Sequence, residues 1–477
     1  MHVMQVRVHH LLYRCLKRQR TSYYSSIAAS DASTQKELPA ITLSQFESLE
    51  NRYSEKLHLF TKLGKSPVPT VRFPTDLLKE IEIVAGQPPA SRTEPNEQRK
   101  PQGGPIFERV PWSSITCAFN DREQYYHILA QLPKIYSSLM HILTPLKKRL
   151  GQSYAPRTVI DIGGGAGEGL LAAKTCFGSK VKGTLVTQRQ MWDRLKGLHQ
   201  DTTFMTRAPV GSTYDLVIAS HILLTAASPR RAIFDAWKLV SEGGLLVFVE
   251  TGSLSGFKQI VAARDALTRD ELGTVSRILA PCPHEKECPL AGSRDICNFG
   301  QNFWVEGPLR LKSIRKGRKD HTEFSYVVIQ RGVRRPDMPN PDCGEQLKDV
   351  QKQSAEKVDE LTLANEAFHW PRIIRDPQKK GGHVTFKMCT APGAFSSWTV
   401  PKSFGNQAYH DARKSRWGEL WALGAKTKVP LKVRKVGKGK YDKLKDQRMA
   451  KNMRLDEATR RTRVDRGKGQ DSEFQIV

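Results

Sequence analysis

The sequence predicts an α/β protein with a doubly wound parallel sheet, a helical N-terminal region and a C-terminal β-rich part built around cysteines. Between residues 158 and 249, short β-branched apolar runs alternate with helical stretches. A glycine loop follows the first of these runs, and a cysteine-rich segment follows soon after Ala262, where the alternation stops. Strands that alternate with helices are typical of a parallel sheet covered by helices on both faces.

The spacing of apolar residues predicts each element in turn. The strands expected in the α/β part are Thr158–Ile162, Gly183–Thr187, Tyr214–Ala219 and Gly244–Val249. The helices expected around and between them are Leu43–Leu63, Thr75–Ile83, Tyr125–Leu150, Gly169–Cys176, Gln190–Leu198 and Arg230–Val240. Two further strands are expected at Ser325–Gln330 and His383–Met388. Gln87–Pro105 is rich in Pro, Gly and charge and predicts a linker.

The charge balance points to a polyanionic partner. The 477 residues include 76 Lys and Arg against 48 Asp and Glu, a formal net charge of +28. Nucleic acid is the leading candidate, ahead of an anionic membrane surface. No apolar stretch of about 20 residues is present, so no transmembrane helix is expected. Residues 425–477 predict a basic tail that is disordered until it meets a partner.

The first 30 residues have the composition of an N-terminal targeting sequence. They contain no Asp or Glu, and at 100° per residue Arg7, Arg14 and Arg18 share one side of a helix. Hydroxyl residues follow at Thr21–Ser30. An Arg-rich, acid-free amphipathic start is typical of a mitochondrial transit peptide, while an ordinary basic helix is the alternative. We expect a mature protein that begins near residue 30 and lies in the mitochondrial matrix.

The glycine loop after the first strand is a candidate cofactor cradle. Asp161 lies at the strand end, and Gly163, Gly165 and Gly167 follow at alternate positions. Such a loop lets backbone N–H groups approach a ligand at a helix N-terminus. The dinucleotide pattern fails because Glu168 stands where the third glycine belongs. The pattern instead resembles that of a Rossmann-like S-adenosylmethionine-dependent methyltransferase fold, although a glycine turn that binds nothing is the alternative.

Residues for methyl transfer are not visible. The second strand is followed by Gln188 and Arg189, where such folds usually carry an acid for the ribose hydroxyls. No Pro-Pro-aromatic or Pro-Cys motif follows the later strands. His221 could act as a base, but a lone His beyond a strand end is more often structural. The sequence therefore predicts weak or no S-adenosylmethionine binding and names no catalytic residue.

Three cysteines fall within 16 residues. Cys282, Cys288 and Cys297 lie in a segment where prolines flank the thiols and fix the loop. In a reducing matrix a metal or cluster explains them better than a disulfide. For a fourth ligand we choose Cys389, which follows a strand and precedes a Pro-Gly turn, over Cys343 in a polar loop.

The spacing of these cysteines does not choose the metal. It matches neither a zinc ribbon nor a bacterial ferredoxin run, and His284 is a candidate zinc ligand. Zinc and an iron–sulfur cluster therefore remain open on spacing alone, and three buried thiols without metal are the third interpretation.

Several stretches together resemble one family between about Tyr125 and Leu420. They are Leu132–Tyr136, Val159–Gly167, Val249–Phe257, Ala263-Arg264, Cys282–Cys297, Gly382–Val384 leading to Cys389, and Tyr409–Gly418. The chain resembles the methyltransferase-like family of mitochondrial small-ribosomal-subunit proteins and assembly factors, which has bacterial relatives described as ribosomal small-subunit methyltransferases. The resemblance implies binding to small-subunit rRNA and ribosomal proteins. It also implies a 4Fe–4S cluster on four cysteines, which match Cys282, Cys288, Cys297 and Cys389 and favour iron–sulfur over zinc.

The RNA contacts are expected near the C-terminal end of the resemblance. Arg413, Lys414, Arg416 and Trp417 fall in one helical stretch, where the cations would meet phosphates and the indole could stack on a base. A core position for Trp417 is the alternative.

The expected division of the chain has five parts. They are a transit peptide (1–30), a helical region and linker (31–124), a methyltransferase-like domain (125–265), a cysteine-cluster, RNA-binding β-rich domain (266–424) and a basic tail (425–477). Nothing in the sequence points to a homo-oligomer.

Three functions compete on the sequence alone. A small-subunit protein or assembly factor that binds rRNA leads. An active rRNA methyltransferase and an iron–sulfur sensor of cluster supply are the alternatives.

Overall fold

The computed structural model describes residues 56–66, 68–86, 127–151, 154–163, 165–268, 274–309, 319–335 and 360–433. The expected transit peptide, the linker at 87–105, Cys343 and the tail beyond 433 lie outside these residues, as do residues 43–55 of the first expected helix. All but one of the described residues belong to one compact unit, Leu57–Val477. Across them, no helix is both long and apolar enough to cross a bilayer.

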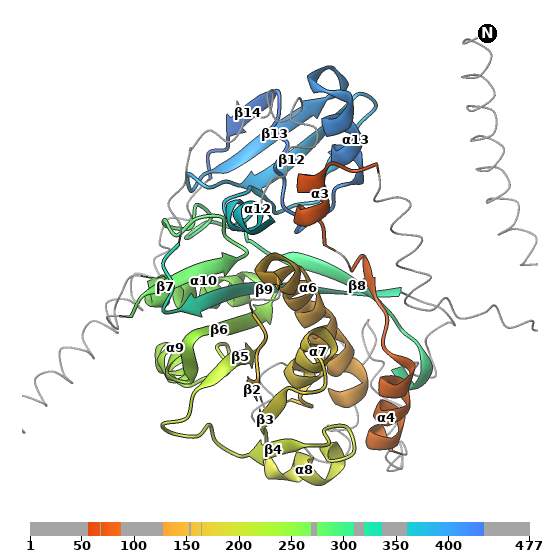
Figure 1. Cartoon of the computed structure of the whole chain (residues 1–477), viewed down its shortest axis with the longest axis vertical. Helices are drawn as coiled ribbons and strands as arrows, with labels where there is room; N and C mark the ends of the chain where they lie inside the picture. Colours follow the sequence, from red (N-terminus) through yellow and green to blue (C-terminus); the bar gives the residue numbers. More distant parts are fainter. Residues whose placement is uncertain are drawn as a thin grey trace, which may run out of the picture. The chain divides into compact units, whose positions relative to one another are not determined.

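Nine strands of the described chain form one twisted sheet (Figure 1). Its parallel half contains β2 (Thr158–Ile162), β3 (Lys182–Val186), β4 (Thr202–Met205), β5 (Tyr214–Ser220) and β6 (Val240–Thr251). They are arranged β4-β3-β2-β5-β6, which is the 3-2-1-4-5 order of a doubly wound fold. The expected Rossmann-like arrangement is therefore confirmed, and β4 is a strand that the sequence pattern did not predict.

Helices cover both faces of this half because the strands are apolar on both sides. In β6, Leu245 and Val247 belong to one core, while Leu246 and Phe248 belong to the other. The first core packs against α4 (Thr75–Ala85), α6 (Leu132–Leu150), α7 (Glu168–Phe177) and α8 (Arg189–Leu195). The second packs mainly against α9 (Pro229–Lys238) and α10 (Leu254–Thr268). Each expected helix from Thr75 onward is confirmed to within a few residues, and a π-helical turn, η3 (His127–Gln131), precedes α6.

The antiparallel edge of this sheet differs from the expected domain division. The long strand β9 (Lys319–Arg331) pairs with β6, and beyond it lie β7 (Ser276–Ala280), β8 (Phe299–Trp304) and the short β1 (Thr70–Val71). Residues 276–331 therefore complete the large sheet instead of starting a separate domain at residue 266. The reason is that the Phe324–Gln330 part of β9 is buried on both faces, as an interior strand must be.

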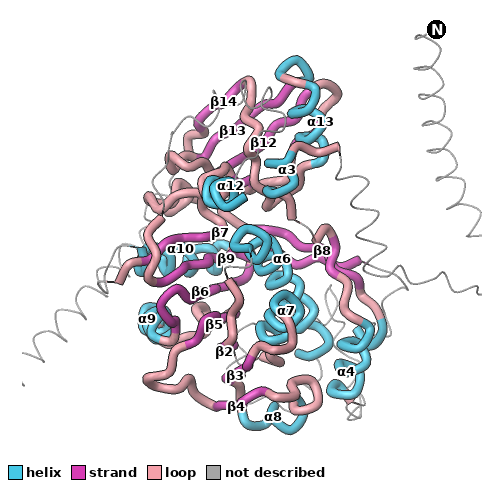
Figure 2. Tube along the Cα trace, in the orientation of Figure 1, coloured by secondary structure: helices cyan, strands magenta, loops and turns pink. Residues whose placement is uncertain are grey.

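A second, five-stranded antiparallel sheet forms the C-terminal part (Figure 2). It contains β10 (Arg372–Ile373), β11 (Gln378–Lys379), β12 (His383–Cys389), β13 (Phe395–Pro401) and β14 (Thr427–Pro430). The helix α13 (Asn406–Lys414) packs on it through Ala408 and Ala412, beside the buried Trp421. The short helices α3 (Leu59–Gly64) and α12 (Glu360–Glu366), with η5 (Gly307–Leu309) and η6 (Lys402–Phe404), complete the described elements.

Candidate functional site

All four predicted metal ligands line one cavity. Cys282, Cys288, Cys297 and Cys389 surround about 510 Å³ of empty space, part of which opens to solvent. Apolar side chains such as Phe257 complete the wall, together with one cation, Arg264. The fourth ligand chosen from the sequence thus joins the other three, although it lies far from them along the chain.

The sheet topology explains why these thiols meet. The strands β7 and β8 pair with successive parts of the same edge of β9, and there is a break between the two pairings. The loop that connects β7 to β8 leaves the edge of the sheet at this break. Cys282 follows β7 by two residues, and Cys297 precedes β8 by two. Tyr326 and Val327, from β9 beside the break, line the same cavity. Cys389 is the last residue of β12, so the fourth thiol comes from the other sheet.

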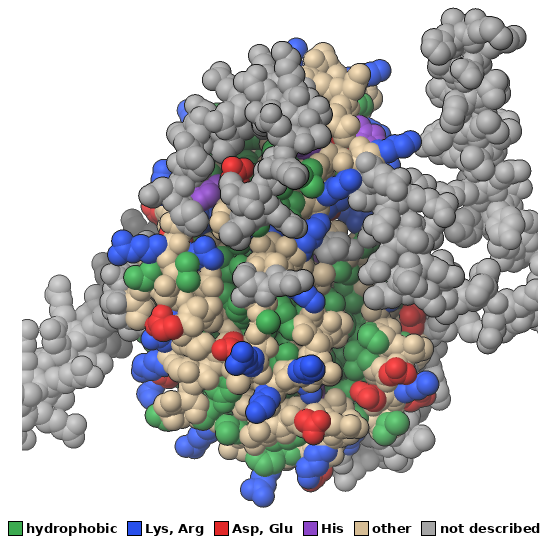
Figure 3. All heavy atoms as spheres, viewed as in Figure 1, with side chains coloured by type: hydrophobic (Ala, Val, Ile, Leu, Met, Phe, Trp, Pro, Cys, Tyr) green, Lys and Arg blue, Asp and Glu red, His purple; other side chains and the backbone are tan. Residues whose placement is uncertain are grey.

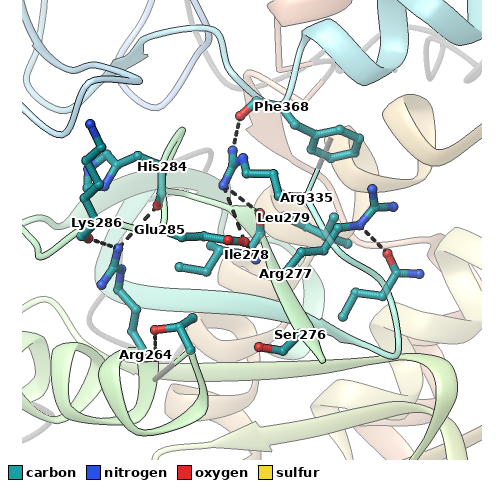
Figure 4. A network of polar contacts seen from close by, with 12 residues as sticks. Arg264, Ser276, Arg277, Ile278, Leu279, His284, Glu285, Lys286, Arg335 and Phe368 are labelled. Carbon is teal, nitrogen blue, oxygen red and sulfur yellow. Dashed lines mark hydrogen bonds and ion pairs between the residues drawn. The ribbon is translucent and has the colours of Figure 1, made fainter. Parts of the chain in front are cut away.

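A network of polar contacts holds the cysteine loop in place (Figure 4). Arg264 of α10 donates hydrogen bonds to the carbonyl oxygens of His284, at 3.3 Å, and Lys286. The Glu285 carboxylate accepts from the backbone N–H of Ile278 at 2.9 Å. Arg335 lies between this carboxylate and the carbonyl oxygen of Phe368 (Figure 4). The loop backbone is therefore held by Arg264 in the cavity wall and by Glu285 and Arg335, while its thiols line the cavity.

Burial and mutual proximity raise the pKa values of three of the four thiols. Burial, followed by the neighbouring Cys282, raises the pKa of Cys288 to about 12. Burial and the adjacent thiols raise the pKa values of Cys297 and Cys389 well above the ordinary value. Burial lowers the pKa of Arg264, but Cys282, Asp265 and Cys288 together outweigh this effect and leave the pKa raised. A metal centre would supply the charge that turns such thiols into thiolate ligands.

The four thiols do not converge on one point. Among the described residues, no three His, Cys, Asp or Glu side chains converge closely enough to hold one metal ion. A zinc site would need its thiolates within about 2.3 Å of one point. Thiolates that surround a wider space suit a cluster, in which each binds a different iron. His284 Nε2 lies 3.2 Å from Cys389 Sγ, and burial lowers the pKa of His284 to about 3, so its ring is neutral.

The glycine loop differs from the cysteine cavity because its carboxylates are hydrogen-bonded to other groups of the same chain. Asp161 Oδ2 accepts hydrogen bonds from the N–H groups of Gly169, at 2.7 Å, and Leu170, at 3.3 Å, so it caps the chain's own helix α7. Burial, with the nearby Glu168, raises the pKa of Asp161 to about 7. Burial alone would raise the pKa of Glu168, but His127 at 3.1 Å and the backbone N–H groups of Glu168 and Ala166 hold it below its ordinary value.

The chain's own atoms fill the space that the glycines leave. A Cβ on Gly165 would lie 2.5 Å from Glu168 Oε2, and one on Gly163 would lie 2.8 Å from the Ser220 carbonyl oxygen. A Cβ on Gly167 would collide with the ring of His199. His199 Nε2 donates to the Ala166 carbonyl oxygen at 2.6 Å. The three predicted cofactor-binding glycines thus allow the loop to pack closely against Glu168, Ser220 and His199.

Two further positions singled out from the sequence have structural surroundings. His221 is buried with a left-handed φ of 58°, and its Nδ1 lies 3.8 Å from Glu250 Oε2. Arg189, where an acid was expected, lies with its guanidinium 5.6 Å from the centre of the Trp192 ring. Neither arrangement presents a base or a carboxylate to a cofactor.

Three of the four predicted RNA-binding residues are exposed, and two of them lie in α13, which ends at Lys414. Arg413 and Lys414 end α13, and both are exposed, as is Arg416. Trp417 is half-buried, and its Nε1 makes no hydrogen bond to any described residue. Lys and Arg side chains are spread over the face seen in Figure 3, with acidic side chains among them on its lower part.

One buried arginine joins the cysteine loop to this basic segment. Arg372 of β10 donates from Nε to the Pro281 carbonyl oxygen, at 2.6 Å, and from its terminal nitrogen to that of Gly418, at 2.7 Å. Pro281 precedes Cys282, and Gly418 follows Trp417. In addition, Arg372 pairs with Cys389 in the β10–β12 ladder. The cavity and the basic segment therefore share a backbone scaffold.

Residues 122–422 match the family described as mitochondrial small ribosomal subunit Rsm22. The chain belongs to the Rsm22 family. The match includes the glycine loop, all four cavity cysteines and the segment Arg413–Trp417. The resemblance expected from the sequence is thereby confirmed.

Two curated relatives show the extent of this likeness. The "Rsm22-cox11 tandem protein 2, mitochondrial" of Schizosaccharomyces pombe is 34% identical over 354 residues, which are 68% of this chain and 46% of the relative. This chain thus spans about half the length of that protein. The "Ribosome assembly protein RSM22, mitochondrial" of Saccharomyces cerevisiae is 26% identical over 451 residues, with 67% of this chain and 70% of the relative covered.

Among solved structures, the plantazolicin methyltransferase BpumL in complex with SAH superposes with a TM-score of 0.32 and 9% identity. That superposition covers 46% of this chain and 94% of the other.

Sequence reasoning missed the residues that support these sites in this Rsm22-family chain. Arg264 appeared only as part of the resemblance, and Arg372 gave no signal, because an isolated arginine in a short apolar run has no periodic pattern. His199 and Glu168 were missed as the groups that fill the glycine loop. Nothing in the sequence around a histidine on a distant loop shows which backbone segment its ring will contact in the fold.

Proposed function

We propose that this chain acts in assembly of the mitochondrial small ribosomal subunit, in the matrix, as a protein that binds small-subunit rRNA and holds a 4Fe–4S cluster without catalysing methyl transfer. The observation that carries the proposal is the Rsm22-family match, since it includes both the cysteine cavity and the exposed basic segment. The mitochondrial and ribosome-assembly names of the relatives agree with this role.

The cluster part of the proposal rests on the chemistry of the cavity. Cys282, Cys288, Cys297 and Cys389 would hold the cluster, whose iron would offset the charge of four thiolates. Arg264 would donate to the Cys282 sulfur, and hydrogen bonds and positive charge around a cluster tune its reduction potential. Such a cluster would join two loops that are distant in sequence, so it would stabilise the fold as well as fill the cavity.

The RNA part rests on charge and exposure. The chain carries a net charge of +28, and Arg413 and Lys414 are exposed at the end of the folded helix α13. Arg416, which was expected in the same helix, is exposed in the segment that follows it. Cations on a folded element fix the register of a nucleic acid, since phosphate contacts position the protein on its target. Small-subunit rRNA, together with ribosomal proteins, is the partner that the family description suggests.

The methyltransferase alternative gains no support from the glycine loop. Methyl transfer needs the cofactor at that loop, but Glu168 and His199 lie against its backbone. The ribose-binding acid is absent as well, because Gln188 and Arg189 follow the second strand of the fold. We therefore assign the methyltransferase-like fold a structural role in presenting the cysteine loop and the RNA-binding surface.

A salt titration of RNA binding tests this function. The full chain, loaded under anaerobic conditions, is titrated against small-subunit rRNA fragments at several salt concentrations. Reversing Arg413 and Lys414 to Glu should weaken binding, and the log–log salt slope should fall by about 0.7 to 0.9 for each phosphate that the variant no longer binds. The matched control reverses Lys180 and Lys182, two exposed cations of the α/β part, to Glu.

If both double variants bind alike, the basic segment is not the contact surface. If the unchanged protein does not bind the rRNA fragments at all, the RNA-binding function is wrong.

A further inference from the structure

A second surface with RNA-binding chemistry lies on the edge of the large sheet. In the β8–β9 ladder, Gly300 pairs with Glu323, Asn302 with His321, and Trp304 with Lys319. Side chains of directly paired residues share one face of a sheet. The alternate β8 residues Phe299, Gln301 and Phe303 are buried against α6 and the core. We call the opposite face, with Asn302, Trp304, Lys319 and His321, the β8–β9 face; all four are exposed or half-exposed.

One end of the β8–β9 face opens into a cleft. About 860 Å³ of empty space, partly open to solvent, lies between this face and the C-terminal part, and Trp417 and Arg416 line it. A Cβ on Gly300 would lie 3.1 Å from Trp417 Cζ3 and 2.5 Å from His321 Cε1. The glycine therefore lets two aromatic rings approach over the strand.

The other end of the β8–β9 face carries a second indole between two cations. The guanidinium of Arg72 lies 5.0 Å from the centre of the Trp304 ring, and the Lys319 ammonium lies 4.7 Å from it. Arg72 is itself 54% exposed and only 3.9 Å from Glu306. Trp304 is four residues from Gly300, so the two aromatic positions are about 13 Å apart at about 3.3 Å per residue. That distance is suited to a few nucleotides of a single strand.

We propose that the β8–β9 face binds single-stranded RNA, with one unpaired base in the cleft against Trp417 and His321 and a second base stacked on Trp304. Aromatic rings on a sheet are the usual platform for unpaired bases, and the cations beside them meet the phosphates.

The charge in the cleft favours a base over a phosphate there. Glu323 and Asp376 line it, and carboxylates repel phosphate but accept hydrogen bonds from base amino groups. His321 Nδ1 and Asn302 Oδ1, 2.9 Å apart, place further polar atoms on the same face. The inference rests on the RNA-binding function proposed above and assigns it to a surface separate from Arg413 and Lys414.

Binding of a labelled 12-nucleotide single-stranded RNA and of a 12-base-pair duplex, at one salt concentration, tests the proposal. The variants are Trp304→Ala and His321→Ala, and the control is Trp192→Ala, a half-buried indole that also neighbours an arginine. Loss of one stacked base should lower single-strand affinity about 5- to 150-fold, which corresponds to about 1–3 kcal/mol. Duplex affinity should change by less than about 2-fold.

Photocrosslinking of a thiouridine-labelled strand to the unchanged protein gives a readout that does not depend on the folding of a variant. Crosslinked peptides should contain Trp417 or residues of β8 and β9. Unchanged single-strand affinity in Trp304→Ala and His321→Ala, or crosslinks confined to other segments, would overturn the proposal while leaving the RNA-binding function intact. An unchanged protein that binds neither RNA would instead refute the function itself.

Discussion

The glycine loop and the cysteine cavity are the two places where this fold could hold a cofactor, and they differ in what faces them. At the glycine loop, the chain's own carboxylate and imidazole contact the backbone that a ligand would need. At the cavity, four thiols face empty space, while the backbone of their loop is satisfied from behind by Arg264 and Arg372.

This difference distinguishes a region that keeps only the shape of a cofactor-binding fold, the glycine loop, from a region that still has the groups to bind a cofactor, the cysteine cavity. Both regions carry a recognisable pattern in the sequence, but in the described residues only the second brings four thiols around empty space. Buried polar groups are normally satisfied, so a group that the chain itself satisfies needs no ligand. Clustered buried thiols become thiolates only when a ligand such as a metal centre supplies positive charge.

The largest expected effect is the loss of a cavity ligand. Cys297→Ser and Cys389→Ser should each lose iron and lower the free energy of unfolding by on the order of 5 kcal/mol, since a bound metal centre contributes to folding. Iron content and thermal unfolding of anaerobic preparations measure both effects. Cys176→Ser is the control, because Cys176 is equally buried but lies in α7, away from the cavity. It should keep its iron.

Iron that survives Cys389→Ser but disappears in Cys343→Ser would mean that the fourth ligand was chosen wrongly.

A smaller effect is expected at the glycine loop. Gly165→Ala places a methyl group 2.5 Å from Glu168 Oε2 and should destabilise the protein by about 1–3 kcal/mol, as overpacking does. Gly381→Ala, with open space around its Cβ, should change stability by less than about 0.5 kcal/mol.

Adding Glu168→Ala to Gly165→Ala should cost less than the sum of the two single changes, because it removes the colliding group. Denaturant unfolding measures all four proteins. Strict additivity would show that the carboxylate does not fill the loop.

The sequence predicted the elements, and which cysteines would lie together, better than their surroundings. Four of the five strands of the parallel half were predicted from β-branched runs, and the meeting of the four cysteines from their clustering and the rigid position of Cys389. The place of β9 in the large sheet was not predicted, because an apolar run does not reveal its partner strand. The filling of the glycine loop could not be predicted either, since the same glycines suit a bound cofactor and a neighbouring side chain such as His199. The aromatic β8–β9 face escaped notice because Trp304 and His321 meet only through strand pairing.

The most direct test measures both regions in one preparation of the unchanged protein, purified without oxygen. Iron and acid-labile sulfide are determined, and S-adenosylmethionine is titrated into the same sample by calorimetry. We expect about four iron atoms per chain and no binding heat at micromolar S-adenosylmethionine. Stoichiometric zinc without iron would contradict the assignment of a cluster to the cysteine cavity. Micromolar S-adenosylmethionine binding would contradict the account of the glycine loop as filled by the chain's own side chains.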